Sequence, residues 1–390
     1  MSTVTAVTVL ELFSGIGGMH IALQETGKLF HIVSSYEINP TALAVYNYNF
    51  GHKHQIKERN IMGMNAEFLE NLHPDLVVMS PPCQPFTRQG LKKDTNDARC
   101  SPLLHIISLL KSIQKLPQMI LLENVSGFEC SEARKELIQV LKEKEYIIQE
   151  YMLTPSQFGI PNSRLRYFLL AKHSSPFCFH VSEKIESSLP VCTCYHIISA
   201  VREFPESCSN CKKTINKSIS FLINKKLGKL IKHDLKVNDS TSLQDLTPPI
   251  SYYIENLEDP LPFLVKKNIL LKYAKVFDIV NSSSKGSCCF TKGYSHYVQG
   301  TGSVYIHNPK ANLNETFKAL NGIEESDKRY EDLLLSLQLR YFTPREVLRL
   351  MGFPESFDFP NDCSNKQLYK VLGNSVNVFI VTLLLLILLE

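Results

Sequence analysis

The sequence predicts a doubly wound α/β fold with a smaller domain inserted into it. Over the first half of the chain, short apolar runs alternate with amphipathic segments, as in a parallel sheet with helices on its faces. After about His173 this order fades into a stretch richer in Ser, Asn, Lys and Cys, and it returns near Thr343. We therefore predict a first part of the large domain over residues 1–183, an inserted domain over 184–340, and a segment over 341–390 that returns to the large domain.

Each strand of the predicted sheet is a short run of mostly apolar residues. These runs cover residues 7–13, 31–37, 76–80, 119–123 and 166–171. A glycine-rich turn over 14–18 and a helical segment over 19–26 follow the first run. Asn39-Pro40 is expected to open the next helix, because proline is favoured in the first helical turn. Pro344 predicts a helix start near the C-terminus for the same reason.

The composition is typical of a globular intracellular protein. The chain has 390 residues, of which 44% are hydrophobic and 21% are charged. The first residues lack the basic start and apolar core of a secretory signal, so the 11 cysteines are expected to be reduced. The apolar run 378–389 is too short to span a bilayer and suits a buried terminal helix. We expect a cytoplasmic monomer; the sequence leaves open whether it also enters the nucleus.

Two features of the inserted region have alternative interpretations. Residues 207–233 carry seven lysines and no acidic residue, which suits either a solvated surface or contact with phosphates. The net charge of +4 agrees weakly with a polyanionic partner. Four cysteines could form a zinc site, but the spacing of the first pair is unusual, so we favour reduced thiols and expect no metal. They are Cys192, Cys194, Cys208 and Cys211.

The turn after the first strand suits a nucleoside ligand. Glycines at 15, 17 and 18 let the backbone approach a ligand, while the following helix presents free N–H groups. Glu37 ends the second strand, where a carboxylate can accept hydrogen bonds from ribose hydroxyls. The spacing differs from the G-x-G-x-x-G fingerprint, so a nicotinamide cofactor is disfavoured. A simple tight turn is the alternative, and the acidic strand end favours nucleoside binding over it.

Cys83 is the candidate nucleophile. It follows a strand end in Ser80-Pro81-Pro82-Cys83-Gln84-Pro85, and prolines on both sides stiffen the loop. An isolated cysteine is more often an inert core residue, but this proline frame argues against a core strand.

Two further motifs could bring charge to the same edge of the sheet. Glu123 ends a strand, where it could act in a site or simply be a solvated or capping residue. Arg164 and Arg166 alternate at a strand start, so their side chains share one side and suit carboxylate or phosphate binding. An ordinary salt-bridged edge is the competing interpretation.

Together these segments resemble the cytosine-5 methyltransferases, and they occur in that family's order. The matching motifs are Phe13 to Gly18, Glu37, Pro82-Cys83-Gln84, Glu123-Asn124-Val125, Arg164-x-Arg166 and Gly373-Asn374-Ser375-Val376. The resemblance implies a catalytic domain that binds S-adenosyl-L-methionine and releases S-adenosyl-L-homocysteine. It also implies that the inserted region, which matches poorly, is a target-recognition domain.

The resemblance assigns roles to individual residues. Cys83 would attack C6 of cytosine, Glu123 would contact N3 and the amino group, and Arg164 and Arg166 would hold the base or Glu123. The donor site would comprise Phe13, Ser14, Gly15, Ile16, Gly17, Gly18, Glu37, Ile38, Asn60, Ile61, Ser80, Asn374, Ser375 and Val376. Many family members have aspartate where this chain has Asn60. Substrate contacts would come from Pro82, Gln84, Asn124, Cys289, Phe290, Thr291 and Tyr294.

One segment is similar to the signature of a particular branch of that family. Cys289-Phe290-Thr291 and Tyr294 match the Cys-Phe-Thr-x-x-Tyr pattern of a branch known chiefly for methylating cytosine 38 in the anticodon loop of aspartate tRNA. Pro81 and Asn162 agree with this branch. We therefore predict a tRNA methyltransferase, with a DNA methyltransferase as the second candidate. A catalytically silent nucleic-acid-binding protein is the third, and the intact Cys83 and Glu123 argue against it.

Overall fold

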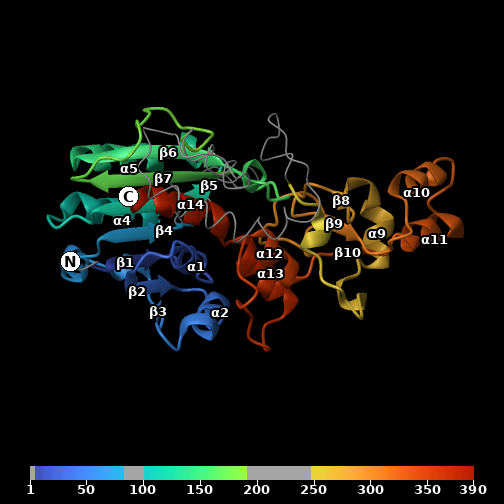
Figure 1. Cartoon of the computed structure of the whole chain (residues 1–390). Helices are drawn as coiled ribbons and strands as arrows, with labels where there is room; N and C mark the ends of the chain where they lie inside the picture. Colours follow the sequence, from blue (N-terminus) through green and yellow to red (C-terminus); the bar gives the residue numbers. More distant parts are fainter. Residues whose placement is uncertain (1–4, 83–100, 191–246) are drawn as a thin grey trace, which may run out of the picture.

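The computed structural model describes residues 5–82, 101–190 and 247–390, and its centre is a seven-stranded sheet (Figure 1). The strand order is β3-β2-β1-β4-β5-β7-β6. Neighbouring strands run parallel except β7, which is antiparallel to both β5 and β6. The strands are β1 (Val7–Leu12), β2 (Phe30–Glu37), β3 (Lys57–Glu58), β4 (Leu76–Met79), β5 (Met119–Val125), β6 (Tyr146–Leu153) and β7 (Arg166–His173).

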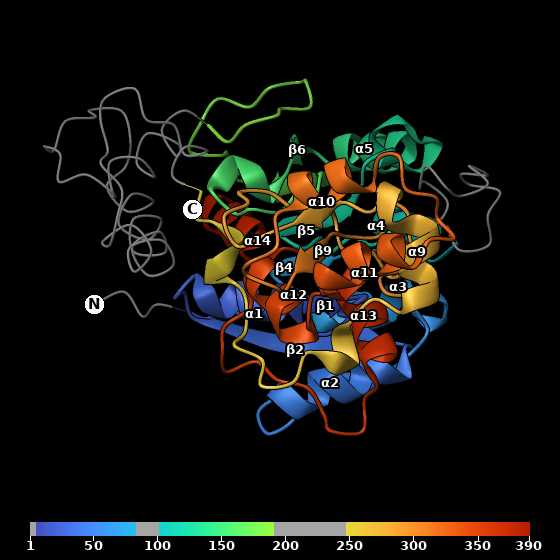
Figure 2. The ribbon, with the colours of Figure 1, turned by 90° about the vertical axis from the view of Figure 1, so that its right-hand side faces the viewer.

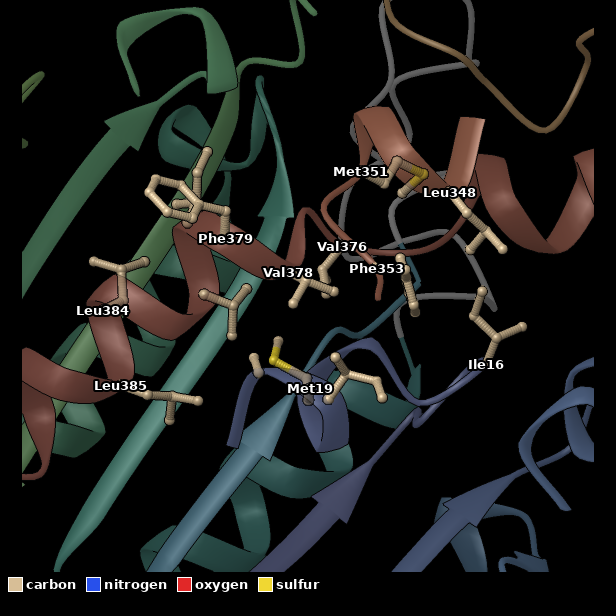
Figure 3. Packing of buried hydrophobic residues seen from close by; sticks show 14 of the residues in the cluster. Ile16, Met19, Leu348, Met351, Phe353, Val376, Val378, Phe379, Leu384 and Leu385 are labelled. Carbon is tan, nitrogen blue, oxygen red and sulfur yellow. The ribbon is translucent and has the colours of Figure 1, made fainter. Parts of the chain in front are cut away.

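Helices cover both faces of this sheet, as the doubly wound prediction requires. Val9 packs in one apolar cluster and its neighbour Leu10 in another, because successive strand residues point to opposite faces. Helices α1 (Gly18–Glu25), α2 (Pro40–Phe50) and α14 (Val378–Leu388) build the first cluster. Helices α3 (Ala66–Leu72), α4 (Ser101–Ser112) and α5 (Glu132–Glu143) build the second. Figure 3 shows Met19 of α1 beside Leu385 and Val378 of α14.

The predicted strands are observed with ends shifted by at most two residues. The two helix starts predicted at Pro40 and Pro344 are confirmed. The side chain of Asn39 accepts a hydrogen bond from the N–H of Ala42, and Thr343 caps α12 (Pro344–Leu350) together with Glu346. Short 3-10 turns lie at Ile61–Gly63, Phe128–Cys130, Pro155–Phe158, Ile250–Tyr252, Leu261–Phe263 and Ala274–Val276.

The C-terminal apolar segment is a buried helix, as predicted. By length and composition, Asn365–Leu388 could cross a membrane, but 89% of its most apolar window is buried inside the protein. Residues 374–377 divide it into α13 (Asn365–Gly373) and α14. All residues of α14 are buried, and the helix packs between α1 and the sheet (Figure 3). It is therefore a core helix of the large domain.

A second, three-stranded sheet lies beside the large one (Figures 1 and 2). It contains β8 (Ile279–Val280), β9 (Val304–Ile306) and β10 (Leu339–Tyr341) in the order β10-β9-β8. Helices α9 (Lys267–Tyr273), α10 (Leu313–Leu320) and α11 (Lys328–Ser336) share its separate apolar cluster. Helices α12 and α13 lie between the two sheets. The predicted inserted domain includes residues 191–246, which lie outside the described part of the chain, so its boundaries stay a prediction.

A buried ion pair joins the small sheet to α12. The guanidinium of Arg340 in β10 makes two hydrogen bonds to the carboxylate of Glu346, at 2.8 and 2.7 Å, and neither side chain is exposed. The Tyr305 ring covers the guanidinium at 4.8 Å, and Glu346 also accepts hydrogen bonds from the N–H groups of Glu255 and Thr343. Because Val347 and Leu348 of α12 pack in a cluster of the large sheet, this pair couples the two parts of the protein.

Replacing Arg340 with methionine is expected to lower the free energy of unfolding by about 3–5 kcal/mol, because it leaves a buried carboxylate without its countercharge. Urea denaturation followed by circular dichroism would measure the loss. The matched control is Arg349→Met, which breaks the bridge to Glu355, where the side chains are 26% and 66% exposed. That loss should stay below about 1 kcal/mol. Equal losses for both variants would contradict the importance of the buried pair.

Candidate functional site

A cavity of about 360 Å³ opens where the strands of the large sheet end. It lies at the carboxyl ends of β1, β2, β4 and β5, beside the switch in strand order between β1 and β4, which is where open α/β sheets bind ligands. The antiparallel β7 begins at the same edge. The lining residues are Phe13, Gly15, Tyr36, Glu37, Ile38, Asn39, Ala42, Arg59, Asn60, Ile61, Ser80, Pro81, Pro82, Pro102, Glu123, Val125, Arg164, Arg166, Val371, Gly373 and Asn374.

On one side of the cavity, Glu37 ties the glycine-rich turn to the end of β2. Its carboxylate accepts hydrogen bonds from the N–H groups of Gly15, Ile38 and Asn39 at 2.8–2.9 Å. A carboxylate offers about four lone-pair sites, so one site stays open for a ligand hydroxyl. Ile38 is 59% exposed although it is apolar, and it lines the cavity together with Ile61. This side therefore offers an acceptor for a hydroxyl group next to an apolar surface for a flat ring.

Several predicted donor-site residues shape the turn without lining the cavity. Gly17 has φ of 91°, and a Cβ there would lie 2.3 Å from the Phe50 ring. A Cβ on Gly18 would lie 2.7 Å from Val376, so the start of α1 needs glycine to pack against the C-terminal segment. Six predicted donor-site residues do not line the cavity: Ser14, Ile16, Gly17, Gly18, Ser375 and Val376. Figure 3 shows Ile16, Phe353 and Val376 in this packing.

Polar side chains around the cavity form hydrogen bonds within the protein. Ser14 donates inward to the carbonyl of Glu11 at 3.2 Å, and Ser80 donates to the carbonyl of Phe13 at 3.2 Å. The side-chain oxygen of Asn60 accepts from the N–H of Met62 at 3.0 Å and caps a 3-10 turn. These bonds hold the backbone around the cavity in place before any ligand arrives.

On the other side of the cavity, Glu123 is a buried carboxyl group beside two arginines. It is 7% exposed, and its Oε1 lies 3.3 Å from Nε of Arg166. Burial raises the pKa of Glu123, and the charges of Arg166 and Arg164 oppose this rise without cancelling it. A raised pKa makes it easier for a carboxyl group to hold a proton and to donate it to a ligand.

Arg164 joins its own segment to two others that are distant in the sequence. Its guanidinium donates to the carbonyls of Phe290 at 3.2 Å, Gly373 at 3.3 Å and Ser375. Its Nε is buried and has no hydrogen-bond partner among the described residues. Arg164 thus lines the cavity and also anchors its walls.

Cys289 places a second thiol beside the arginine pair. Its Sγ lies 3.5 Å from a terminal nitrogen of Arg164 and 3.7 Å from one of Arg166. Burial alone would raise the pKa of this thiol, but Arg164 and Arg166 outweigh burial, so the pKa is lowered. Cys289 therefore belongs to the electrostatic environment of Glu123, although it does not line the cavity.

Other predicted substrate residues serve the framework. Phe290 and Tyr294 are 3% and 2% exposed, and the Tyr294 hydroxyl donates to the carbonyl of Ser303. The N–H of Thr291 bonds to the carbonyl of Thr301 at 2.9 Å. Asn124 is buried, and its amide donates to the carbonyl of Pro81 at 3.5 Å, which holds the loop before Cys83. These four residues thus have partners within the protein, and none of the four lines the cavity.

Several predicted features lie outside the described residues. They are Cys83, Gln84, the lysines between 207 and 233, and the cysteines at 192, 194, 208 and 211. Pro82, which directly precedes Cys83, lines the cavity.

Nine lining residues were not among the predicted site residues, namely Tyr36, Asn39, Ala42, Arg59, Pro81, Pro102, Val125, Val371 and Gly373. Asn39 directly follows the predicted site residue Ile38, and Val125 directly follows Asn124, so both could have been predicted from these neighbours. Arg59 lines the cavity, and its guanidinium packs on the Phe68 ring at 4.3 Å, a contact that no local pattern encodes. Val371 comes from α13, far along the chain.

A buried polar network lies below the glycine-rich turn. The Tyr46 hydroxyl donates to Oε2 of Glu11 at 2.9 Å, while Oε1 of Glu11 has no hydrogen-bond partner in the part of the chain that the structure describes. His20 contacts the Tyr46 hydroxyl through Nδ1 at 2.8 Å and stacks on Phe50 at 4.0 Å. Burial raises the pKa of Glu11 to about 8 and lowers the pKa of His20 to about 3. Since Phe50 also contacts Gly17, this network supports the turn.

Comparisons with known proteins agree with this fold and site. The family model of C-5 cytosine-specific DNA methylases matches residues 7–386. A mouse tRNA (cytosine(38)-C(5))-methyltransferase is 40% identical, with 98% of this chain and 93% of the relative covered. A Dictyostelium discoideum DNA (cytosine-5)-methyltransferase is 35% identical, with 97% and 93% covered. The crystal structure of a Spodoptera frugiperda DNMT2 mutant superposes with a TM-score of 0.78 at 37% identity, covering 99% of this chain and 100% of that one.

The fold is thus a doubly wound α/β methyltransferase fold, as predicted. The chain belongs to the family of C-5 cytosine-specific DNA methylases and is a cytosine C5 methyltransferase. Its substrate is a nucleic acid, in agreement with the prediction.

Proposed function

We propose that this protein transfers a methyl group from S-adenosyl-L-methionine to C5 of cytosine 38 in the anticodon loop of aspartate tRNA. The main support is the similarity over nearly the full length to relatives named tRNA (cytosine(38)-C(5))-methyltransferase, which range from mouse to Schizosaccharomyces pombe. The Cys289-Phe290-Thr291 segment, which contacts the arginine pair, agrees with this substrate.

The residues around the cavity fit the proposed donor. Glu37 has an open acceptor site for a ribose hydroxyl, and Ile38 and Ile61 offer apolar surface for adenine. Gly15 has no side chain, and no protein atom beyond its chain neighbours lies within 4 Å of the position that a Cβ would take. A ligand can therefore approach the backbone there. When bound, the donor supplies an electrophilic methyl group. Phe13, Ser80 and Asn374 would surround its methionine end.

In the proposed mechanism, the Cys83 thiolate attacks C6 of cytosine and forms a covalent S–C6 bond. Glu123 donates its proton or a hydrogen bond to N3, which receives the electron density displaced by this attack. C5 then becomes nucleophilic and accepts the methyl group, with S-adenosyl-L-homocysteine as the leaving group. Solvent water takes the C5 proton, and any proton given to N3 returns to Glu123. The C5–C6 double bond then re-forms as the S–C6 bond breaks and releases Cys83 as a thiolate. Arg166 keeps Glu123 in place at 3.3 Å.

An RNA loop suits this chemistry better than a duplex. The target base must leave its stack to bring C6 to a thiol, and this costs less in an unpaired loop. A DNA substrate is the second candidate, because one relative at 35% identity is named a DNA (cytosine-5)-methyltransferase.

Incubation with labelled S-adenosyl-L-methionine and either total tRNA or duplex DNA would separate these candidates. We expect label in tRNA, with base-resolution sequencing placing it at cytosine 38 of aspartate tRNA. The Cys83→Ala variant is the inactive control and should leave that position unmethylated. Labelling confined to DNA, or to another tRNA position, would contradict the proposal.

A further inference from the structure

Tyr297 is the most exposed aromatic side chain among the described residues, with 65% of its surface accessible. Single apolar residues on a surface usually need no explanation, so exposure alone carries no conclusion. Two further observations distinguish Tyr297: the turn that carries it is held firmly, and that turn packs against the wall of the methyltransferase cavity.

The turn is anchored by a buried residue three positions earlier. The Tyr294 ring packs edge-on against the rings of Phe290 and Tyr369, and its hydroxyl accepts from the N–H of Phe342 at 2.8 Å. The N–H of Tyr297 bonds to the carbonyl of Gly293 at 2.9 Å, and its own carbonyl accepts from the Thr301 hydroxyl at 2.7 Å. The backbone of Tyr297 is therefore fixed while its ring stays in solvent.

The ring itself has a restricted position. A Cβ on Gly293 would lie 2.9 Å from Cδ2 of Tyr297, so the ring folds over this glycine. The ring of His296 lies beside it in an edge-to-face arrangement, with centroids 4.6 Å apart. Lys292, on the same turn, is exposed and carries a positive charge.

The same turn forms part of the cavity surroundings. A Cβ on Gly373 would lie 2.1 Å from the backbone nitrogen of Lys292, so the two backbones are in close contact. Gly373 lines the cavity and its carbonyl accepts from Arg164. Tyr297 therefore stands on a rigid turn that is one packing layer from the site where cytosine would bind.

We propose that the Tyr297 ring stacks on an unpaired base of the RNA loop next to the target cytosine. This rests on the proposed function, since it requires single-stranded RNA at the cavity. Extruding a cytosine removes the stacking partner of its neighbour, and an exposed aromatic ring can replace that partner. The flanking His296 and the exposed Lys292 suit an adjacent base and phosphate in the same strand.

The test uses a stem-loop RNA with the anticodon-arm sequence of aspartate tRNA. Tyr297→Ala should raise the KM for this RNA about five- to hundredfold, the range measured for loss of one base–aromatic stack. Tyr297→Phe should restore the wild-type KM, whereas Tyr297→Leu, which keeps apolar bulk without a π-face, should not. The dissociation constant for S-adenosyl-L-methionine without RNA should be the same in all variants.

The control is Tyr48→Ala, which removes a tyrosine of similar exposure, 55%, from α2. It should leave the KM for RNA unchanged. As a direct readout, 2-aminopurine next to the target cytosine should stay quenched on binding wild type and become brighter with Tyr297→Leu. If the wild type methylates the RNA but the Tyr297 variants change neither the KM nor the quenching, the stacking proposal is wrong and the proposed function stands. Absence of RNA methylation by wild type would instead overturn the proposed function.

Discussion

Replacing Glu123 with glutamine is expected to lower kcat by about 10²- to 10⁴-fold, the usual contribution of a positioned acid. Glutamine has nearly the same shape and can still accept from Arg166, but it has no proton to transfer to N3. The KM for RNA should change little, because the side chain continues to fill the same space beside the base. Single-turnover methylation of the tRNA substrate would measure the chemical step without product release.

The pH dependence provides a second readout of the same role. Because burial raises the pKa of Glu123, the wild-type rate should fall as pH rises through that pKa and the acid loses its proton. Glu123→Gln should lack this alkaline limb. The matched control is Glu150→Gln, which changes a buried carboxylate that binds Arg134 at 2.6 Å and lies outside the cavity. It should lower stability and keep kcat; a full-rate Glu123→Gln enzyme would exclude the acid role.

The second large effect is expected at Glu11, below the glycine-rich turn. Its pKa rises from 4.5 to about 8 in the folded protein, so the carboxyl group stays protonated when folded and ionises when unfolded. Between these two values the unfolded state binds fewer protons, and folding stability therefore falls as pH rises. Over the whole range between these two pKa values, the free energy of unfolding falls by an amount on the order of 5 kcal/mol, at 1.36 kcal/mol per pKa unit.

Glu11→Gln should remove this pH-dependent loss. A glutamine amide resembles the protonated acid: its oxygen can accept from the Tyr46 hydroxyl, and its NH₂ takes the place of Oε1, for which the described residues supply no hydrogen-bond partner. We therefore expect the variant to gain stability relative to wild type as pH increases from about 5 to 8. Urea denaturation at several pH values would measure this difference. A difference that is independent of pH would show that Glu11 is ionised in the folded protein.

The network around Glu11 also predicts how other titrating groups behave. The neutral His20 and the Ser35 hydroxyl can both donate to Tyr46, and Ser35 in turn contacts His54 at 2.6 Å. Burial lowers the pKa of both histidines, which disfavours their charged forms. Glu11, with its raised pKa, is the group of this network that takes up a proton on folding between pH 5 and 8.

Much of the large domain could be predicted because its signals are local. A buried strand appears in the sequence as a short apolar run, and Asn39-Pro40 and Thr343-Pro344 mark helix starts through hydrogen bonds that span three residues. The order of the glycine turn, Glu37, Glu123 and the arginine pair also predicted one sheet edge. The cavity unites Gly15, Glu37, Glu123, Arg164 and Arg166 at that edge, in agreement with the prediction.

The chemistry at this edge, by contrast, depends on contacts between segments far apart in the sequence. No local period predicts that Arg164 reaches the carbonyls of Phe290 and Gly373, or that Cys289 comes between two guanidinium groups. The raised pKa of Glu123 also needs the packing that excludes water from it. Sequence alone determined the elements and their candidate residues, because periodicity and caps act over a few positions. Only the tertiary structure decided which side chains line the cavity and which hold its walls, because burial and electrostatics depend on the packing of distant segments.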